Sequence, residues 1–158
     1  MAVVREKIKA NLDAVLSRIA DAARRVDRAP SEVRLVAVTK SVGVEKAQVL
    51  LDLGVEHLGE NRVDVAAPKI EALGNGTPVC WHMIGNVQRR RVPKVVRLFN
   101  RVDAVDRLSL AEALEGRCEA AEIDLNILLE INVSGETSKH GFVSADLAEV
   151  LDKISSYK

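Results

Sequence analysis

The sequence has few aromatic residues, no excess charge of either sign and no long apolar run. Only 3% of its 158 residues are aromatic, so its core must be built from Val, Leu, Ile and Ala side chains. The formal net charge is zero, which excludes a global field that would attract nucleic acid or an anionic membrane surface. No apolar run approaches the roughly 20 residues that cross a bilayer. Neither a nucleic acid nor a membrane is therefore expected as a partner.

Cysteine is also scarce, and its positions argue against a metal site. Cys80 and Cys118 are the only two cysteines, they lie far apart, and their spacing matches no metal-binding pattern. Reduced thiols in a cytoplasmic protein are therefore expected. The N-terminal stretch MAVVREKIKANLDAVLSRI is charged throughout and lacks the apolar block of a secretory signal peptide. These absences predict a cytoplasmic protein without a metal ion.

The sequence does contain a regular alternation of short apolar segments with segments of helical periodicity. The predicted strands are 34–39, 55–58, 79–84, 101–105 and 125–133. The predicted helices are 3–28, 44–53, 62–73, 87–99, 107–121 and 145–155. This alternation is typical of parallel strands joined by crossover helices. The predicted fold class is therefore α/β, with a single domain over residues 1–158.

The alternation by itself leaves open whether the strands form an open sheet or part of a barrel. A complete eight-unit barrel takes about 250 residues. Only five strands are predicted within the 158 residues of this sequence. A barrel would therefore be incomplete, and its sheet would have two unpaired edges.

Polar residues follow the predicted strands, at the positions where ligands bind in parallel α/β folds. VAVTK ends on Lys40, HLGENR contains Asn61, WHMIGN contains His82, and LLEINVSG contains Asn132. Strand alternation puts His82 on the same face as Cys80. If the strand faces that carry Lys40, His82 and Asn132 all point into a concave interior, these side chains converge on one pocket. Burial there would favour the uncharged lysine amine, the form that attacks an aldehyde to give an imine.

Each of these positions also has a purely structural interpretation. Lys40 can be a solvated residue at a strand end, and His82 can be a hydrogen-bonded core histidine. Asn61 can cap the helix that follows it. Gly59 and Gly85 can serve turns that require a positive φ angle. Spacing alone does not choose between the structural and the functional interpretations.

The segment QRRRVPKVVR, residues 88–97, contains a cluster of basic side chains. Such clusters occur in nucleic-acid-binding proteins. This one lacks interleaved aromatic residues, and the overall charge of the chain is balanced. A solvated helix face is therefore the favoured interpretation.

Five blocks occur in the order expected of one family: VAVTK, HLGENRV, WHMIGNVQ, VDAVDRLSLAEAL and LLEINVSGETSKHGF. Together they resemble the pyridoxal phosphate homeostasis proteins, relatives of the alanine racemase N-terminal barrel. The resemblance implies a (β/α)₈ TIM-barrel fold with an extra N-terminal helix. It implies that Lys40 forms a Schiff base with pyridoxal 5'-phosphate (PLP) and that Asn61, His82 and Asn132 line the cofactor. The implied function is intracellular PLP homeostasis without robust catalysis.

The resemblance does not extend to the family's last strands, so a barrel truncated at its C-terminus is expected. In such barrels the phosphate is commonly held by loops after strands 7 and 8. PLP binding by a monomer of this chain is therefore expected to be weak or absent. The open barrel edges are expected to be hidden by homo-oligomers or strand exchange.

Two other functions remain open at this stage. One is a racemase-like or lyase-like PLP enzyme, for which His82 and Glu130 are the available acid or base groups. Against it, racemases use a tyrosine from a second domain, and the only tyrosine here is Tyr157. The other is a cofactor-free interaction module, because the phosphate-binding part of the family is not found in the sequence.

Overall fold

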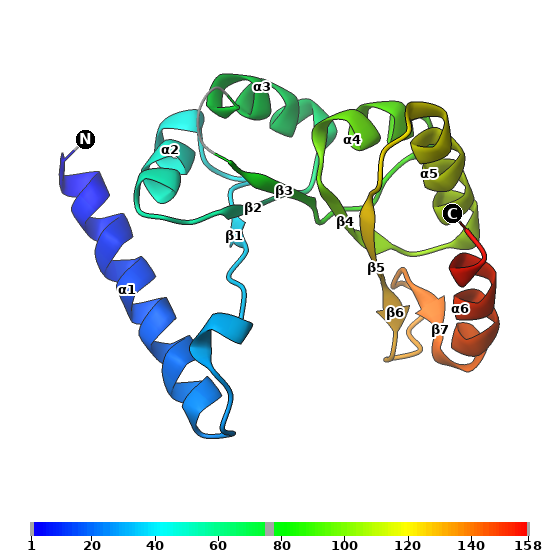
Figure 1. Cartoon of the computed structure of the whole chain (residues 1–158), viewed down its shortest axis with the longest axis horizontal. Coiled ribbons are helices and arrows are strands. Elements are labelled where there is room, and N and C mark those ends of the chain that lie inside the picture. The colour runs from blue at the N-terminus through cyan, green and yellow to red at the C-terminus, as the bar shows by residue number, and fades with distance from the viewer. Residues whose placement is uncertain (1, 75–77, 158) are drawn as a thin grey trace.

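A five-stranded parallel sheet forms the centre of the computed structural model, which describes residues 2–74 and 78–157. The strands lie side by side in chain order, and each pairs in parallel with the next (Figure 1). Their bounds are β1 Ala37–Val38, β2 His57–Glu60, β3 Cys80–Met83, β4 Arg101–Val105 and β5 Asn126–Leu129. The connecting helices are α2 Val44–Asp52, α3 Val63–Leu73, α4 Val92–Leu98 and α5 Leu108–Ala121. The predicted α/β class is confirmed.

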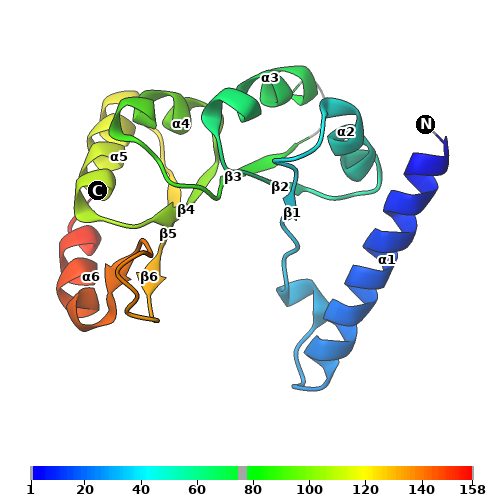
Figure 2. The ribbon, with the colours of Figure 1, turned by 180° about the vertical axis from the view of Figure 1, so that it is seen from behind.

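The four connecting helices all lie on one side of the sheet, as Figures 1 and 2 show from opposite directions. Each helix packs against the next one along the chain. A doubly wound sheet would carry helices on both faces and would reverse its strand order. One-sided helices and sequential strands are instead the arrangement of a (β/α) barrel. The sheet is thus an arc of a barrel, which answers the question that the alternation left open.

The two ends of the arc carry additional elements. At the β1 end lie helix α1 Ala2–Arg24 and the short 3₁₀ helix η1 Pro30–Glu32. At the β5 end lie β6 Ile131–Asn132 and β7 Phe142–Val143, which form a separate two-stranded parallel sheet. The 3₁₀ helix η3 Ser144–Asp146 and helix α6 Leu147–Ser155 follow β7.

The predicted strand 125–133 is wrong as a single element, because the chain changes partners at Glu130. The Glu130 amide donates to the Val105 carbonyl of β4 at 2.8 Å. The Glu130 carbonyl instead accepts from the Phe142 amide, at 2.7 Å. The apolar sequence is therefore divided between two sheets, a division that depends on a partner strand distant in sequence.

Other boundaries also differ from the prediction. The strand predicted over 34–39 is reduced to β1 Ala37–Val38, an edge strand that pairs only with β2. The helix predicted over 3–28 ends at Arg24, and Asp27 adopts the left-handed φ of 52° in the turn that follows. The helix predicted over 87–99 begins as the 3₁₀ helix η2 Arg89–Arg91 before α4, whose first turn contains Pro93. Proline is tolerated there because the first turn needs no amide donor.

The two faces of the sheet differ sharply in burial. On the helix-covered face, Leu58, Trp81, Met83 and Val102 are buried in the hydrophobic core. The opposite face is called the open face here, because no helix covers it (Figure 2). Val38 and Leu128 belong to this face by strand alternation and remain 51% and 50% exposed.

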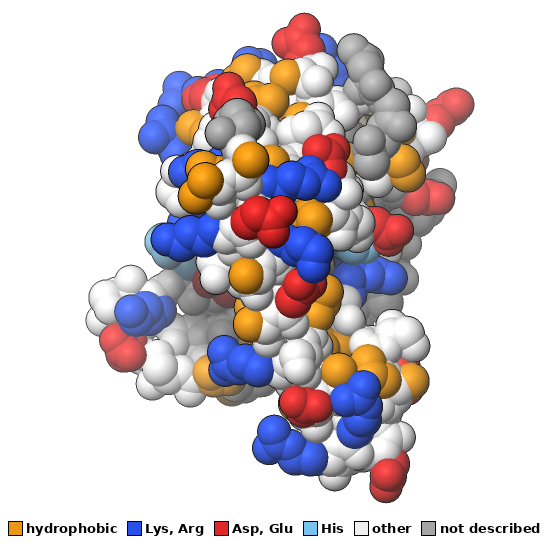
Figure 3. Space-filling model, turned by 90° about the vertical axis from the view of Figure 1, so that its left-hand side faces the viewer, with side chains coloured by type: hydrophobic (Ala, Val, Ile, Leu, Met, Phe, Trp, Pro, Cys, Tyr) orange, Lys and Arg blue, Asp and Glu red, His pale blue; other side chains and the backbone are white. Residues whose placement is uncertain are grey.

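Helix α1 buries little of its apolar side. Only Leu12 and Ala23 are buried along it, whereas Val15 and Leu16 remain exposed. Figure 3 shows this end of the molecule, where apolar side chains lie among positive and negative ones. Within residues 2–74 and 78–157, no helix is both long enough and apolar enough to cross a membrane.

Candidate functional site

Lys40 lies two residues beyond the end of β1, on the side where the strands end. The preceding Thr39 is completely buried, and its amide donates to the Gly59 carbonyl at 2.9 Å, which extends the β1–β2 pairing. Lys40 itself is exposed. The expectation that Lys40 is buried is therefore wrong, because alternation places it with Val38 on the open face.

The Lys40 ammonium has no polar partner among residues 2–74 and 78–157. Among the described residues, none forms a hydrogen bond or an ion pair with this side chain. An exposed, unpaired amine at the end of a strand is accessible to a small molecule. The structure therefore agrees with the structural interpretation of Lys40 as a solvated residue at a strand end.

A buried lysine, Lys69, lies at the strand ends on the covered face, and no sequence pattern predicted its interactions. Lys69 of α3 donates to Glu60 Oε1 at 2.7 Å and to the Thr39 carbonyl at 2.8 Å. The Thr39 hydroxyl also donates to Glu60 Oε1, at 2.7 Å. All three residues are buried. The other Glu60 oxygen, Oε2, is also buried and has no hydrogen-bond partner in the described part of the chain. This network joins α3 to the ends of β1 and β2.

His82 is held by two side chains on the open face. Its Nε2 lies 2.9 Å from His57 Nδ1, and its Nδ1 lies 2.6 Å from Asp103 Oδ2. A carboxylate oxygen only accepts, so His82 Nδ1 is the donor to Asp103. With a neutral His82, Nε2 then accepts from His57 Nδ1. His82 is only 3% exposed, as expected for a hydrogen-bonded core histidine, and both of its ring nitrogens are engaged.

Cys80 belongs to the same cluster. It pairs with His57 across β2 and β3, and its side chain lies on the face that carries His82. Burial is the main cause that raises the pKa of the Cys80 thiol. Burial also lowers the pKa of His57, assisted by the positive charge of Arg34. The cluster therefore contains a neutral thiol and a neutral imidazole at pH 7.

Sequence reasoning placed Cys80 and His82 on one face but missed His57 and Asp103. The alternation Cys-Trp-His within one strand was the only signal available. His57 and Asp103 come from neighbouring strands, and their positions depend on the register between strands, which no local pattern specifies.

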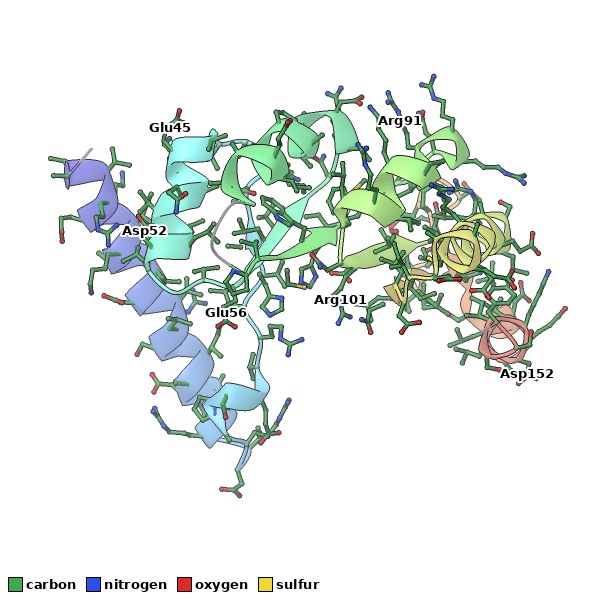
Figure 4. The ribbon with its side chains drawn as sticks, turned by 45° about the horizontal axis from the view of Figure 1, so that its top comes forward. Glu45, Asp52, Glu56, Arg91, Arg101 and Asp152 are labelled. Carbon is green, nitrogen blue, oxygen red and sulfur yellow. The ribbon has the colours of Figure 1, made fainter. Side chains whose placement is uncertain are left out.

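Asn61 borders a cleft of about 340 Å³ at the ends of β2 and β3. Arg62, Asn86 and Arg91 also line this cleft, and Lys40 does not. Asn61 does not cap α3, because the N-cap residue is Arg62. Arg91, labelled in Figure 4, makes an ion pair with Asp64 of α3 at 2.8 Å.

The interpretation of Gly59 and Gly85 as positive-φ residues is wrong, since neither has a positive φ. Gly85 is required for another reason. A Cβ atom there would lie 2.5 Å from the Asn61 carbonyl oxygen, so only glycine permits this close approach of the two loops.

Asn132 of β6 uses its amide to close the loop that follows it. Its Nδ2 donates to the Glu136 carbonyl at 2.9 Å. Its Oδ1 accepts from the Ser134 hydroxyl and from the Gly135 amide, both at 3.0 Å. No hydrogen bond joins any two of the four described residues Lys40, Asn61, His82 and Asn132. The structure thus places each of them in a different local setting along the open face and strand ends.

The fold and the strand-end lysine define a class, the barrel-type α/β proteins with a lysine after their first strand. Residues 10–158 match the family described as alanine racemase, N-terminal domain. Because this match covers nearly the whole chain, the protein belongs to that family.

The curated relatives carry a more specific name, pyridoxal phosphate homeostasis protein. The relative from Pseudomonas aeruginosa is 33% identical over 147 residues, which cover 93% of this chain and 64% of the relative. The relative from Escherichia coli strain K12 is 36% identical over 143 residues, which cover 89% and 61%. The chain thus spans about three-fifths of the length of these relatives. The resemblance read from the five sequence blocks is confirmed.

Solved structures agree with this relationship. A protein described as unknown from Bifidobacterium adolescentis has a TM-score of 0.92 and 30% identity, covering 100% of this chain and 68% of that one. PipY of Synechococcus elongatus, solved with PLP bound, has a TM-score of 0.76 and 28% identity, covering 89% and 65%. Alanine racemase from Streptomyces coelicolor has a TM-score of 0.64 at 17% identity, covers 98% and 38%, and therefore supports the fold alone.

Proposed function

We propose that this protein binds pyridoxal 5'-phosphate through Lys40 and serves intracellular PLP homeostasis. The observation that carries the proposal is the Lys40 amine at the end of β1, which pairs with no described residue, in a chain of the alanine racemase N-terminal domain family. The PLP-bound structure of PipY, at 28% identity, adds support. In parallel α/β folds, ligands bind outside the carboxyl ends of the strands, where Lys40 lies.

The residues around Lys40 fit the aldehyde end of the cofactor. PLP supplies an aldehyde, to which a lysine amine bonds covalently. Gly59 pairs with Val38 and leaves no side chain on the open face between β1 and β3. A Cβ at Gly59 would come within 3.3 Å of Ile84 and 3.4 Å of Val36, so a side chain there would crowd the surface below Lys40.

The other candidate residues have roles that follow from their settings. His82 is fixed by Asp103 and His57, so it forms a rigid part of the open face. Asn132 uses its amide to order the loop 132–136, so we propose that it positions this loop. Asn61 lines the strand-end cleft and is proposed as a polar contact for the cofactor.

We further propose that the protein acts as a cofactor binder without robust catalysis. Both ring nitrogens of His82 are engaged, so it offers no free base. The Tyr157 ring lines a separate cleft formed by α5, β5 and α6. Incubation of the PLP-treated protein with D- and L-amino acids in deuterated water should therefore leave the α-protons unexchanged. Exchange at enzymatic rates would support the racemase-like alternative.

The binding proposal is tested by adding PLP, reducing with borohydride and locating the adduct by mass spectrometry. We expect one stable adduct on Lys40, and its loss in Lys40→Ala. Lys46→Ala is the matched control, because Lys46 is another exposed lysine without a described partner. An adduct distributed equally over several lysines, or unchanged visible absorbance in Lys40→Ala, would refute a specific role of Lys40.

A further inference from the structure

Three potential metal ligands lie together on the open face, within β2 and β3. They are His57 at the start of β2, Cys80 at the start of β3, and His82. One ligand atom from each lies within 4.8 Å of the other two. This grouping is independent of the proposed PLP function, since it does not involve Lys40.

We propose that His57, Cys80 and His82 bind a Zn²⁺ ion through two imidazole nitrogens and one thiolate. Zn²⁺ prefers nitrogen and sulfur donors, and sites with three protein ligands leave a fourth position for water or another small ligand. The cleft that His57 lines gives that fourth ligand a route to the site. This proposal differs from the prediction of no metal site, which considered only the spacing of the two cysteines, because the proposed ligands come from two different strands.

The orientation of His82 suits a ligand. Its Nδ1 donates to Asp103 Oδ2 at 2.6 Å, which directs the lone pair of Nε2 toward His57. A carboxylate bonded to the second nitrogen of a ligating histidine is the usual arrangement in zinc proteins, where it fixes the ring and raises its basicity. Asp103 also accepts from Arg101 Nε at 3.3 Å, which holds the carboxylate in place.

The change that metal binding requires between the two imidazoles is small. Zn–N distances of about 2.0–2.1 Å in a tetrahedral site put two nitrogens about 3.3 Å apart. His57 Nδ1 and His82 Nε2 are 2.9 Å apart, so they must separate by only about 0.4 Å. The His57 proton would move from Nδ1 to Nε2, which keeps this imidazole neutral and frees Nδ1 for the ion. The Cys80 thiol would release its proton to solvent as the thiolate binds.

The surroundings of the cluster include a cleft next to His57 and charged side chains of both signs. His57 lines a cleft of about 330 Å³ between α1, the segment before β1 and the loop before β2. An ion can therefore reach the cluster from outside. Glu56 and Arg101, both labelled in Figure 4, act electrostatically on His57 in opposite directions. A thiol kept neutral by burial is a poor nucleophile, so a role of Cys80 as a reactive cysteine is disfavoured.

The test uses Co²⁺ as a coloured substitute for Zn²⁺ on the chelator-treated, untagged full chain. We expect saturable binding of one equivalent, with ligand-field bands and a thiolate-to-cobalt charge-transfer band. Zn²⁺ should then displace the cobalt and abolish the bands. Cys80→Ser should lose the charge-transfer band, and Cys118→Ser should retain it. Cys118 is the matched control because it is the other half-buried cysteine and lies on α5.

Two further variants sharpen the assignment. His57→Gln removes a ligand and should abolish saturable binding. Asp103→Asn keeps all three ligands, so it should retain the charge-transfer band while weakening Co²⁺ affinity about 10–100-fold. Absence of saturable binding in the wild type, or a charge-transfer band that survives Cys80→Ser, would overturn the proposal. Equal loss of the band in Cys118→Ser would do so as well.

Discussion

The covered and open faces of the sheet use similar residues in opposite ways. The covered face buries Leu58 and Met83 under the helices, whereas the open face leaves Val38 and Leu128 half exposed. Each face also has a lysine near the end of β1. Lys69 is buried against Glu60, while Lys40 is exposed and unpaired among the described residues.

The two lysines show that the environment, and not the residue type, assigns a role. The Lys69 ammonium donates hydrogen bonds to the buried Glu60 carboxylate and to the Thr39 carbonyl, so its amine is unavailable for chemistry. Lys40 stabilises nothing that the structure describes, and its amine is available. A lysine that contributes no packing at a strand end is a better candidate for ligand binding than a buried one.

The largest effect is expected from breaking the buried ion pair. Lys69→Met leaves the Glu60 carboxylate buried without its cation, which should lower the free energy of unfolding by about 3–5 kcal/mol. Urea denaturation followed by the fluorescence of Trp81, the only tryptophan, measures this change.

The matched control is the exposed pair of Lys153 and Glu112, whose 2.6 Å distance is close to the 2.7 Å of the buried pair. Lys153→Met should leave stability nearly unchanged, because water screens exposed pairs. The double variant Lys69→Met with Glu60→Leu should recover much of the loss, because it removes both charges. Equal effects of the two single lysine variants would show that burial does not distinguish these pairs.

The next largest effect on the free energy of unfolding is expected when one leucine on each face of the sheet is replaced by alanine. Leu58→Ala should destabilise the protein by about 2–5 kcal/mol, since it leaves a cavity in the core. Leu128→Ala should change the free energy of unfolding by no more than about 0.5 kcal/mol, because half of the Leu128 side chain already contacts water. Denaturation curves for both variants test the contrast. A large loss in Leu128→Ala would indicate that the open face is covered in solution.

The smallest of these effects concerns association between copies. Self-association through the open parts of the arc stays a prediction, and the exposed apolar residues Val38 and Leu128 favour it. Leu128→Glu should then raise the dissociation constant at least about tenfold, equivalent to about 1.4 kcal/mol. Sedimentation velocity over a range of concentrations measures the constant. A wild-type chain that stays monomeric at every concentration would contradict self-association.

Much of the fold was predictable because it follows local periodicity. The strand Arg101–Val105 has the predicted bounds, and α2, α3 and α5 agree with prediction within a residue or two. Apolar strands and amphipathic helices are patterns that sequence records directly. The failures occurred where a distant partner decides the outcome, as at Glu130, whose two backbone groups bond to different sheets.

The candidate site was predictable to a smaller degree. Strand alternation correctly put Cys80 and His82 on one face, and the five sequence blocks correctly indicated the family. The exposure of Lys40 was not predictable, because a sequence pattern does not say which face of a strand the helices cover. That His57 lies opposite Cys80 was not predictable either, because it depends on the register between β2 and β3.

By itself, the sequence determined the alternating elements, the α/β class, the family and the presence of a lysine after the first strand. These properties depend on neighbouring residues and on blocks that keep their order. Only the tertiary structure decided which lysine is buried, that Asn132 closes its own loop, and that two histidines and a cysteine meet. Those outcomes depend on strand register and on one-sided helix packing, which bring together residues that are far apart in the chain.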